Sequence, residues 1–398
     1  MSTMNNVSKN EYCYGCGVCA ITCPVKAIAI NFNNEGFYKP VIDNSVCTNC
    51  GLCSKICSYN SPSVLEVRTD GIKSFASWSN DEWARSNCSS GGIAYTISEY
   101  FLKKGYNICV VKYDVENEIA RHYIPNSVEA LKESVGSKYL QSYSVAGLEQ
   151  INFKQNNLVI GTPCMIDSFR RLLRRKQVEE NFILVDFFCH GVPSALAWKK
   201  YLKNHKKKLG LIKQVSWRPS NAKWHDSLKM QIKGEHGIYE GGINQGDIFY
   251  RLFLQDYCLG RACYSKCKFK MECSSADIRI GDLWGRKYQS NDKGVSALLA
   301  VSKKGEEVLS EIPGLYLKEE SLSVVVEGQM AKSPMMPNIR ALLLTLMKRE
   351  NRNMTAEQIL INIDTYFRKF QKLILHPKEV ISNRFNENEK KSWDNNNA

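Results

Sequence analysis

The sequence contains no apolar run that approaches the roughly 20 residues of a membrane-spanning helix, so a transmembrane protein is not expected. Its first ten residues, MSTMNNVSKN, lack the apolar segment of a secretory signal peptide. Apolar residues make up 43% of the 398 residues and charged residues 24%, as in ordinary globular proteins. We therefore expect a cytoplasmic protein that is long enough for two domains.

Disulfide bonds are also not expected to account for the sixteen cysteines, because thiols in the cytoplasm are kept reduced. Metal binding is the better explanation for such a high number. Lys and Arg (54) exceed Asp and Glu (40) by 14 charges, which thiolate-bound metal would partly offset. The remaining positive charge suits a phosphate-bearing cofactor or an acidic redox partner.

The densest basic stretch, WKKYLKNHKKKLG at 198–210, places its aromatic and leucine residues on one side of a predicted helix. This pattern indicates a solvated helix face rather than a nucleic-acid surface. We therefore expect no nucleic-acid partner.

A short internal repeat contains half of the cysteines. The segments CYGCGVCAITC (13–23) and CTNCGLCSKIC (47–57) both read Cys-x2-Cys-x2-Cys-x3-Cys, with glycine after the second cysteine. This is the spacing of bacterial ferredoxins with two 4Fe–4S clusters, in which the fourth cysteine of each run ligates the other cluster. One cluster is therefore assigned to Cys13, Cys16, Cys19 and Cys57, and the other to Cys47, Cys50, Cys53 and Cys23. Pro24 follows the first run as in ferredoxins, whereas Ser58 follows the second.

A pair of structural zinc sites is the alternative for this repeat. Zinc sites usually combine two Cys-x2-Cys pairs that are well separated in sequence. Two runs of four closely spaced cysteines favour cubane clusters, which carry single electrons.

The rest of the chain alternates strand-like and helical patterns. Apolar strands are predicted at 27–32, 37–42, 107–114, 157–164, 182–189 and 296–302, and helices at 92–104, 165–177, 194–209 and within 334–374. We predict an α+β fold: a ferredoxin-like domain at 1–65, a larger mixed α/β domain at 72–382 with a helical C-terminal region, and a polar tail at 383–398.

Four further stretches carry small or polar residues. NCSSGGIAY (87–95) places serines and glycines before a helix, whose N-terminus can bind phosphate. VGSKYLQS (135–142) offers a lysine and a tyrosine for a planar anionic cofactor, although a surface turn explains it equally well. GTPC (161–164) and FCHGVPS (188–194) follow apolar strands, where α/β folds place ligand loops.

Together with RIGDLWG (279–285) and DKGVSALLAV (292–301), these stretches resemble the family of coenzyme F420 hydrogenase/dehydrogenase beta subunits, which are iron–sulfur flavoproteins. The resemblance covers about residues 72–302. It implies a bound FAD and a third 4Fe–4S cluster. The implied flavin-binding residues are Ser89, Ser90, Gly91, Gly92, Gly136, Ser137, Lys138 and Tyr139. The implied ligands of the third cluster are Cys164, Cys189, Cys263 and Cys267.

Two departures from the family pattern concern cysteines. Cys88 stands where serine is more common, and CYSKC (263–267) has a three-residue spacing where two are expected. Cys258 and Cys273 lie near enough in sequence to replace an assigned ligand. Cys88 and Cys109 are otherwise expected to act as small buried apolar residues.

Lys138 and His190 are the candidate catalytic residues. Lys138 would hold a substrate anion or offset the charge of the flavin or its phosphates, and His190 would either act in catalysis or orient its loop.

We expect an oxidoreductase in which FAD exchanges a hydride with coenzyme F420 or a similar small carrier. The clusters would pass single electrons to or from a redox partner, either a ferredoxin or another subunit. A flavin is required in this scheme because hydride carries two electrons and each cubane carries one. The alternatives are a ferredoxin-dependent reductase of an organic substrate, for example in surface polysaccharide synthesis, and an electron-transfer subunit without its own substrate.

Overall fold

The computed structural model describes residues 5–67, 71–219, 224, 228–349 and 351–375. By compactness the chain divides into two units, 1–337 and 338–398. The predicted polar tail at 383–398 lies outside the described residues. The domain boundaries predicted from the sequence remain predictions.

The N-terminal repeat forms two matching halves. Each half has a short helix that begins after a left-handed glycine, Gly17 with φ 75° or Gly51 with φ 74°. Only glycine adopts this conformation without steric cost, which explains the glycine after the second cysteine of each run. The elements are α1 Val18–Thr22, β1 Ile28–Phe32, β2 Tyr38–Ile42 and α2 Leu52–Lys55, with β1 and β2 antiparallel as predicted.

The larger region is built on a sheet that has nine strands within the described residues, in the order β14-β3-β13-β12-β8-β7-β4-β5-β6. Its centre, β12-β8-β7-β4, is parallel, whereas β13, β3 and β14 add antiparallel strands at one edge. The bounds are β3 Lys73–Ser79, β4 Asn107–Asp114, β5 Ile119–Tyr123, β6 Ser142–Tyr143, β7 Asn157–Ile160, β8 Phe182–Phe187, β12 Ile278–Asp282, β13 Ser296–Ala300 and β14 Leu315–Glu319.

Successive residues of the central strands belong to different cores. On β8, Ile183 and Val185 pack in one cluster with residues of α4 and α11, and Leu184 packs in another with residues of α7. This alternation follows from the two-residue period of a strand and makes the sheet the middle of three layers. The covering helices are α3 Glu82–Asn87, α4 Ile93–Lys103, α5 Val128–Leu131, α6 Val145–Leu148, α7 Pro163–Lys176 and α11 Lys303–Ser310.

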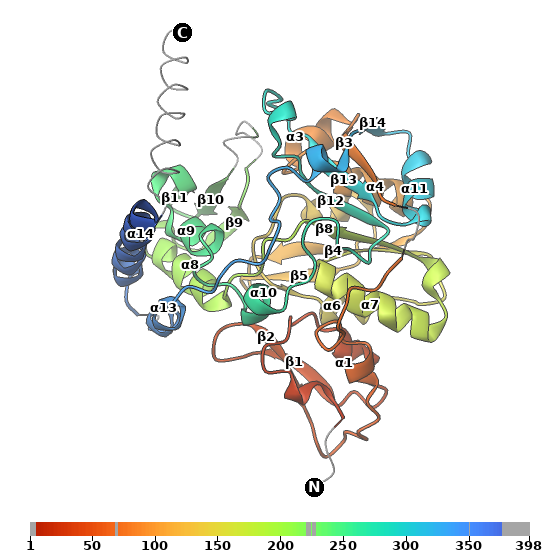
Figure 1. Ribbon diagram of the computed structural model, residues 1–398, viewed down its shortest axis with the longest axis horizontal. Coiled ribbons are helices and arrows are strands. Elements are labelled where there is room, and N and C mark those ends of the chain that lie inside the picture. The colour runs from red at the N-terminus through yellow and green to blue at the C-terminus, as the bar shows by residue number, and fades with distance from the viewer. Residues whose placement is uncertain (1–4, 68–70, 220–223, 225–227, 350, 376–398) are drawn as a thin grey trace. The chain divides into compact units, whose positions relative to one another are not determined.

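The N-terminal region packs directly on this layered region. Val18 and Ile56 are 0% and 2% exposed and belong to the same hydrophobic cluster as α7. Figure 1 shows α1, β1 and β2 beside α6, α7 and α10. The ferredoxin-like region is thus fixed to its neighbour by a shared core.

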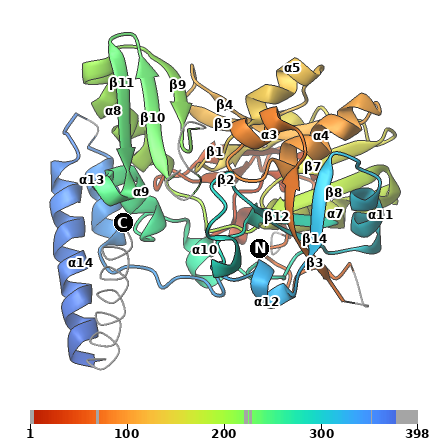
Figure 2. The same cartoon turned by 90° about the horizontal axis from the view of Figure 1, so that it is seen from above.

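A smaller three-stranded antiparallel sheet, β11-β10-β9, packs against α8 (Figure 2). Its sequence carries many polar residues, and none of its strands was predicted. The remaining elements of the first unit are α8 Ala195–Leu209, β9 Ile212–Ser216, β10 Lys229–Gly234, β11 Gly237–Gly242, α9 Ile248–Leu254, α10 Arg261–Ser265 and α12 Leu322–Val325.

The second unit contains α13 Arg340–Met347 and α14 Thr355–Leu375, which confirms the prediction of helices within 334–374. The helices and strands of the first unit predicted from the sequence are also present, within a few residues of the expected bounds. The α+β fold class is therefore confirmed. Among the described residues, no helix combines the length and the apolar character that a membrane span requires.

Candidate functional site

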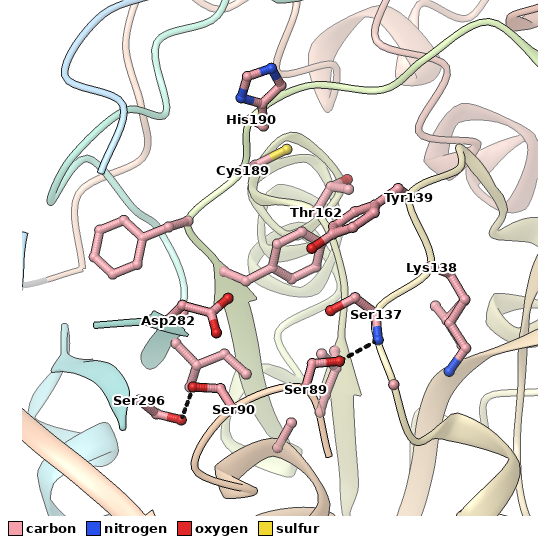
Figure 3. Close-up of a pocket in the computed structure, with 18 of the residues that line it drawn as sticks. Ser89, Ser90, Ser137, Lys138, Tyr139, Thr162, Cys189, His190, Asp282 and Ser296 are labelled. Carbon is pink, nitrogen blue, oxygen red and sulfur yellow. Dashed lines mark hydrogen bonds between the residues drawn. The ribbon is translucent and has the colours of Figure 1, made fainter. Parts of the chain in front are cut away.

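A cavity of about 700 Å³ lies where the central strands end at their carboxyl termini. The residues after β7 (Gly161, Thr162) and after β8 (Phe188 to Val192) line it, together with Asp282 at the end of β12. This is the position at which open α/β sheets bind ligands. Seven of the eight predicted flavin-binding residues line the cavity, and Figure 3 shows several of them.

The N-terminus of α4 opens onto this cavity. Gly92 precedes the helix with φ 82°, and no side chain accepts a hydrogen bond from the first turn. Uncapped N–H groups at a helix N-terminus, together with the helix dipole, favour a bound anion. Gly91 does not line the cavity. It packs against β3 instead, where a Cβ atom would lie 2.6 Å from the carbonyl oxygen of Ser77.

The two predicted flavin loops contact each other. Ser89 Oγ accepts a hydrogen bond of 2.7 Å from the backbone N–H of Ser137 (Figure 3). Ser90 Oγ donates to the carbonyl of Val295 at 3.0 Å and accepts weakly from Ser296 at 3.4 Å. Residues from three distant parts of the sequence therefore form one wall.

Lys138 lines the cavity, but its amine is directed elsewhere. Its Nζ donates to the carbonyl of Val135 at 3.0 Å and to that of Ser134. Figure 3 shows the side chain pointing away from Tyr139 and Asp282. Burial lowers the pKa of Lys138 to about 7. The amine thus holds the end of a short helical turn, and a direct contact with substrate is not supported by its position.

His190 contacts the opposite wall. Its Nε2 lies 3.2 Å from the carbonyl oxygen of Phe253 and 2.9 Å from Asp256 Oδ1. Both neighbours are acceptors, so Nε2 carries a proton. The ring also packs edge-on against Phe253, at 5.0 Å between centroids. These contacts fit a residue that orients its loop.

The side chains that surround Asp282 were not predicted from the sequence as part of the site. Arg218 Nη1 donates to Asp282 Oδ2 at 2.7 Å, and Trp224 Nε1 donates to Oδ1 at 2.9 Å. Trp224 stacks on Trp284 with centroids 5.0 Å apart. The carboxylate faces the interior of the site in Figure 3. The RIGDLWG stretch contains two of these residues, but nothing local links it to Arg218.

His122, on β5, is buried at the cavity wall. Its Nε2 donates to the carbonyl of Ile160 at 3.2 Å, so Nδ1 accepts from the hydroxyl of Ser142 at 2.8 Å. Burial lowers the pKa of His122 to about 4. The folded protein therefore keeps this ring neutral at pH values where the unfolded chain becomes protonated.

We expect stability to fall as the pH drops below 6.5, because only the unfolded chain then gains a proton at His122. Between pH 7.5 and 5.5 this residue should account for about 1.4 kcal/mol of lost stability. Anaerobic urea unfolding at both pH values should show a smaller loss in His122→Gln than in wild type. The exposed His236 provides a control, and an equal loss in His122→Gln and His236→Gln would contradict the assignment.

The thiols assigned to the first cluster lie together. Burial, followed by the neighbouring Cys57 and Cys13, raises the pKa of Cys16 to about 12. Burial and then Cys16, Cys13 and Cys57 raise the pKa of Cys19 in the same way. The fourth cysteine of the second run thus lies near three cysteines of the first, and their assignment to one cluster stays a prediction.

The second set is more open to solvent. Burial raises the pKa of Cys53, with contributions from Cys50 and from Cys23 of the other run. Asn6 Nδ2 lies 3.7 Å from Cys47 Sγ, and Cys50 is exposed. Cys23 of the first run thus lies near Cys53 of the second, and the assignment of Cys23, Cys47, Cys50 and Cys53 to one cluster stays a prediction.

The third set gathers Cys164 at the start of α7, Cys189 in the loop after β8, Cys263 in α10 and Cys267 just after that helix. Burial, followed by Cys16, Cys189 and Cys263, raises the pKa of Cys164, and Cys267 adds to the rise at Cys263. By contrast, the Cys258 thiol donates to the carbonyl of Leu252. Burial and the nearby Glu272 raise the pKa of Cys273, whereas Arg279 lowers it. Cys164, Cys189, Cys263 and Cys267 therefore lie near one another, and their role as ligands of a third cluster stays a prediction.

Such thiol groups need a cation, because burial disfavours their charged form. In the described part of the chain, however, no three His, Cys, Asp or Glu side chains converge closely enough for a single metal ion.

A large sheet with a ligand cavity is thus joined to an N-terminal region that carries the cysteine spacing of two-cluster ferredoxins. Residues 154–323 match the family model for the C terminus of the coenzyme F420 hydrogenase/dehydrogenase beta subunit, and residues 12–61 match the 4Fe–4S dicluster domain. Residues 154–323 therefore carry this family's domain, preceded by a two-cluster domain. The family resemblance predicted from the sequence is confirmed.

One curated relative is the F subunit of F(420)H(2) dehydrogenase from Methanosarcina mazei, with 27% identity over 192 residues. The match covers 45% of this chain and 53% of that protein, so the chain spans about half the length of the relative. A solved chain of the F420-reducing NiFe hydrogenase complex from Methanosarcina barkeri is 16% identical, with a TM-score of 0.44 over 73% of this chain and 90% of that one.

Proposed function

We propose that this chain is an iron–sulfur flavoprotein that transfers electrons between a hydride carrier, such as coenzyme F420, and a one-electron redox partner. One observation carries the proposal. Cys189, a member of the third thiol group, lies on the wall of the same cavity as the α4 N-terminus. A flavin in that cavity would therefore neighbour a cluster held by Cys189.

The cavity suits FAD in size and in chemistry. A volume of about 700 Å³ falls in the range of cofactor pockets, and aromatic residues such as Phe187 and Phe253 line it. The uncapped N-terminus of α4 would hold a phosphate, and Ser89 and Ser137 would fix the surrounding loops. Bound flavin supplies the exchange between electron pairs and single electrons.

The protein's own residues prepare the site for this chemistry. Arg218 and Trp224 hold the Asp282 carboxylate in place, while Tyr139 packs on Phe253 with centroids 5.2 Å apart. Lys138 and His190 act as positioning residues, because backbone carbonyls already engage Nζ of the lysine and Nε2 of the histidine.

The proposal is tested on protein reconstituted anaerobically with iron, sulfide and FAD. Reduced coenzyme F420 should bleach the flavin absorbance in wild type. If bleaching occurs only when reduced ferredoxin is supplied, electrons run in the other direction, toward an organic substrate. If no flavin is retained, the flavoprotein proposal is wrong.

We expect Gly92→Val to weaken FAD binding at least about tenfold, a loss of about 1.4 kcal/mol. A side chain at this left-handed position is strained, and its Cβ atom would lie 3.2 Å from the Ala84 backbone. Displacing the start of α4 would move the N–H groups that bind phosphate. FAD content and iron content of the purified variant measure this, and the N-terminal iron should be unchanged.

Gly105, just beyond the other end of α4, provides a matched control. It has nearly the same φ, 83°, and open space around its Cβ position. Gly105→Val therefore carries similar backbone strain but should retain FAD. Full flavin occupancy in Gly92→Val would show that the α4 N-terminus does not hold the cofactor.

A further inference from the structure

Ser58 breaks the symmetry of the cysteine repeat. It follows Cys57, at the position where Pro24 follows Cys23 in the first run. Ser58 is 0% exposed, whereas Pro24 is exposed. A proline at position 58 would lack both the N–H and the hydroxyl group. The structure shows that both of these groups are used.

Ser58 connects the N-terminal region to α7. Its backbone N–H donates to Ser168 Oγ at 3.0 Å, and its hydroxyl donates to the carbonyl of Cys164 at 3.0 Å. The hydroxyl of Ser168, itself 0% exposed, donates to Ser58 Oγ at 3.0 Å. The residue after one proposed ligand, Cys57, is thus bonded to the main chain of another, Cys164.

Ser168 also reaches the first thiol group. Its Oγ lies 3.7 Å from Cys16 Sγ. A single buried hydroxyl on α7 therefore lies beside a proposed ligand of the first cluster, one helical turn beyond Cys164, a proposed ligand of the third.

A second set of hydrogen bonds connects the same two regions. Tyr14, which follows Cys13, donates its hydroxyl to the carbonyl of Lys266, which precedes Cys267. Lys268 Nζ then donates to the carbonyl of Ser58 at 2.7 Å. The chain neighbours of Cys13, Cys57 and Cys267 are therefore joined directly.

We infer that Ser58 and Ser168 are positioning residues. They hold the third cluster site beside the site of Cys13, Cys16, Cys19 and Cys57, so that electrons cross between these two sites; this step is called the crossing. This inference rests on the proposed function. The site of Cys23, Cys47, Cys50 and Cys53 then becomes the outer terminus, where Cys50 is exposed to a redox partner.

The crossing moves one electron at a time. A reduced centre at Cys164 and its companions is oxidised, and the centre at Cys16 and its companions is reduced, with no bond formed or broken. The hydride carrier supplies the electron pairs, and the one-electron partner removes them singly.

The test mixes oxidised, fully loaded protein with reduced coenzyme F420 and follows the N-terminal cluster signals by rapid-freeze electron paramagnetic resonance. Ser58→Pro should slow the appearance of these signals at least tenfold, while flavin bleaching keeps its wild-type rate. Ser168→Ala, which replaces a small buried side chain, should slow it severalfold and serves if Ser58→Pro does not fold. Pro24→Ser, the reciprocal change at the outer site, should have no effect. Wild-type rates in both Ser58→Pro and Ser168→Ala would overturn the inference.

A second measurement does not depend on the hydride carrier. In dithionite-reduced protein, neighbouring clusters should broaden each other's paramagnetic signals. The broadening of the third cluster should persist in Cys47→Ala and disappear in Cys13→Ala. The opposite pattern would place the outer site next to the third cluster and refute the crossing. If the flavin is not bleached but the expected pattern is found, the crossing stands and the proposed hydride carrier is wrong.

Discussion

Replacing Cys16 by alanine should abolish electron exchange through the N-terminal region while leaving reduction of the cavity-bound flavin intact. Cys16 is a proposed ligand of the cluster nearest the third site, with its sulfur 3.7 Å from Ser168 Oγ. The cavity is lined by other parts of the chain, so its occupancy should not depend on this thiol. Anaerobic stopped-flow absorbance would follow both reactions, with reduced coenzyme F420 as donor and ferredoxin as acceptor.

Cys109 provides the matched control. It is also buried, at 1% exposed, and burial alone raises its pKa, without neighbouring thiols. Cys109→Ala removes one thiol from a packed core but should retain full iron and both activities. If Cys16→Ala still exchanges electrons with ferredoxin at the normal rate, the N-terminal clusters are structural and do not form a relay.

The spacing of the cysteines in the repeat was enough to predict which thiols group together. In the two-cluster ferredoxin pattern the fourth cysteine of one run joins the three closely spaced cysteines of the other, so the two runs predicted the pairing of Cys57 with Cys13, Cys16 and Cys19. The proximity of these thiols supports that grouping. The same holds for the loops after β7 and β8, because strand ends define ligand positions in an open sheet.

Contacts between distant segments could not be read in this way. The partners of Ser58 are more than 100 residues away. The repeat alone therefore gives no sign that a serine at this position makes contacts that a proline could not make. Similarly, Asp282 and Arg218 are 64 residues apart, and only folding brings them to one cavity wall. The lysine in VGSKYLQS was a plausible ligand by type, but its direction depends on a local turn.

Two of the strands that were not predicted, β9 and β11, carry exposed polar residues such as Lys213 and Glu240, so they lack the apolar runs of a buried strand. The central strand β8 was predicted because both of its faces are covered and its sequence is apolar throughout except for Asp186. The neighbouring central strand β12 was not predicted, because its five residues include a buried arginine, a glycine and an aspartate. The order of the nine strands followed from neither pattern, because pairing across the sheet is a tertiary property.

Arg279→Leu is expected to destabilise the protein by about 3–5 kcal/mol, the range for removing one partner of a buried ion pair. Arg279 on β12 and Asp186 on β8 have side chains that are both 0% exposed. Nε and Nη2 of the arginine each donate to the carboxylate at 2.7 Å, and the variant would leave that charge buried without its cation. Anaerobic urea unfolding would measure the loss.

The size of this effect should depend on burial rather than on charge alone. Arg286, whose side chain is 90% exposed, pairs with Glu327 at 2.8 Å, and its replacement by leucine should cost about 1 kcal/mol or less. Arg279 also donates through Nη1 to the carbonyl of Met271 at 2.6 Å, which holds the segment after Cys267 against the sheet. Arg279→Leu should therefore lose iron from the third cluster at urea concentrations that leave the N-terminal clusters intact. Equal stability losses in the two arginine variants would show that the buried pair does not anchor this segment.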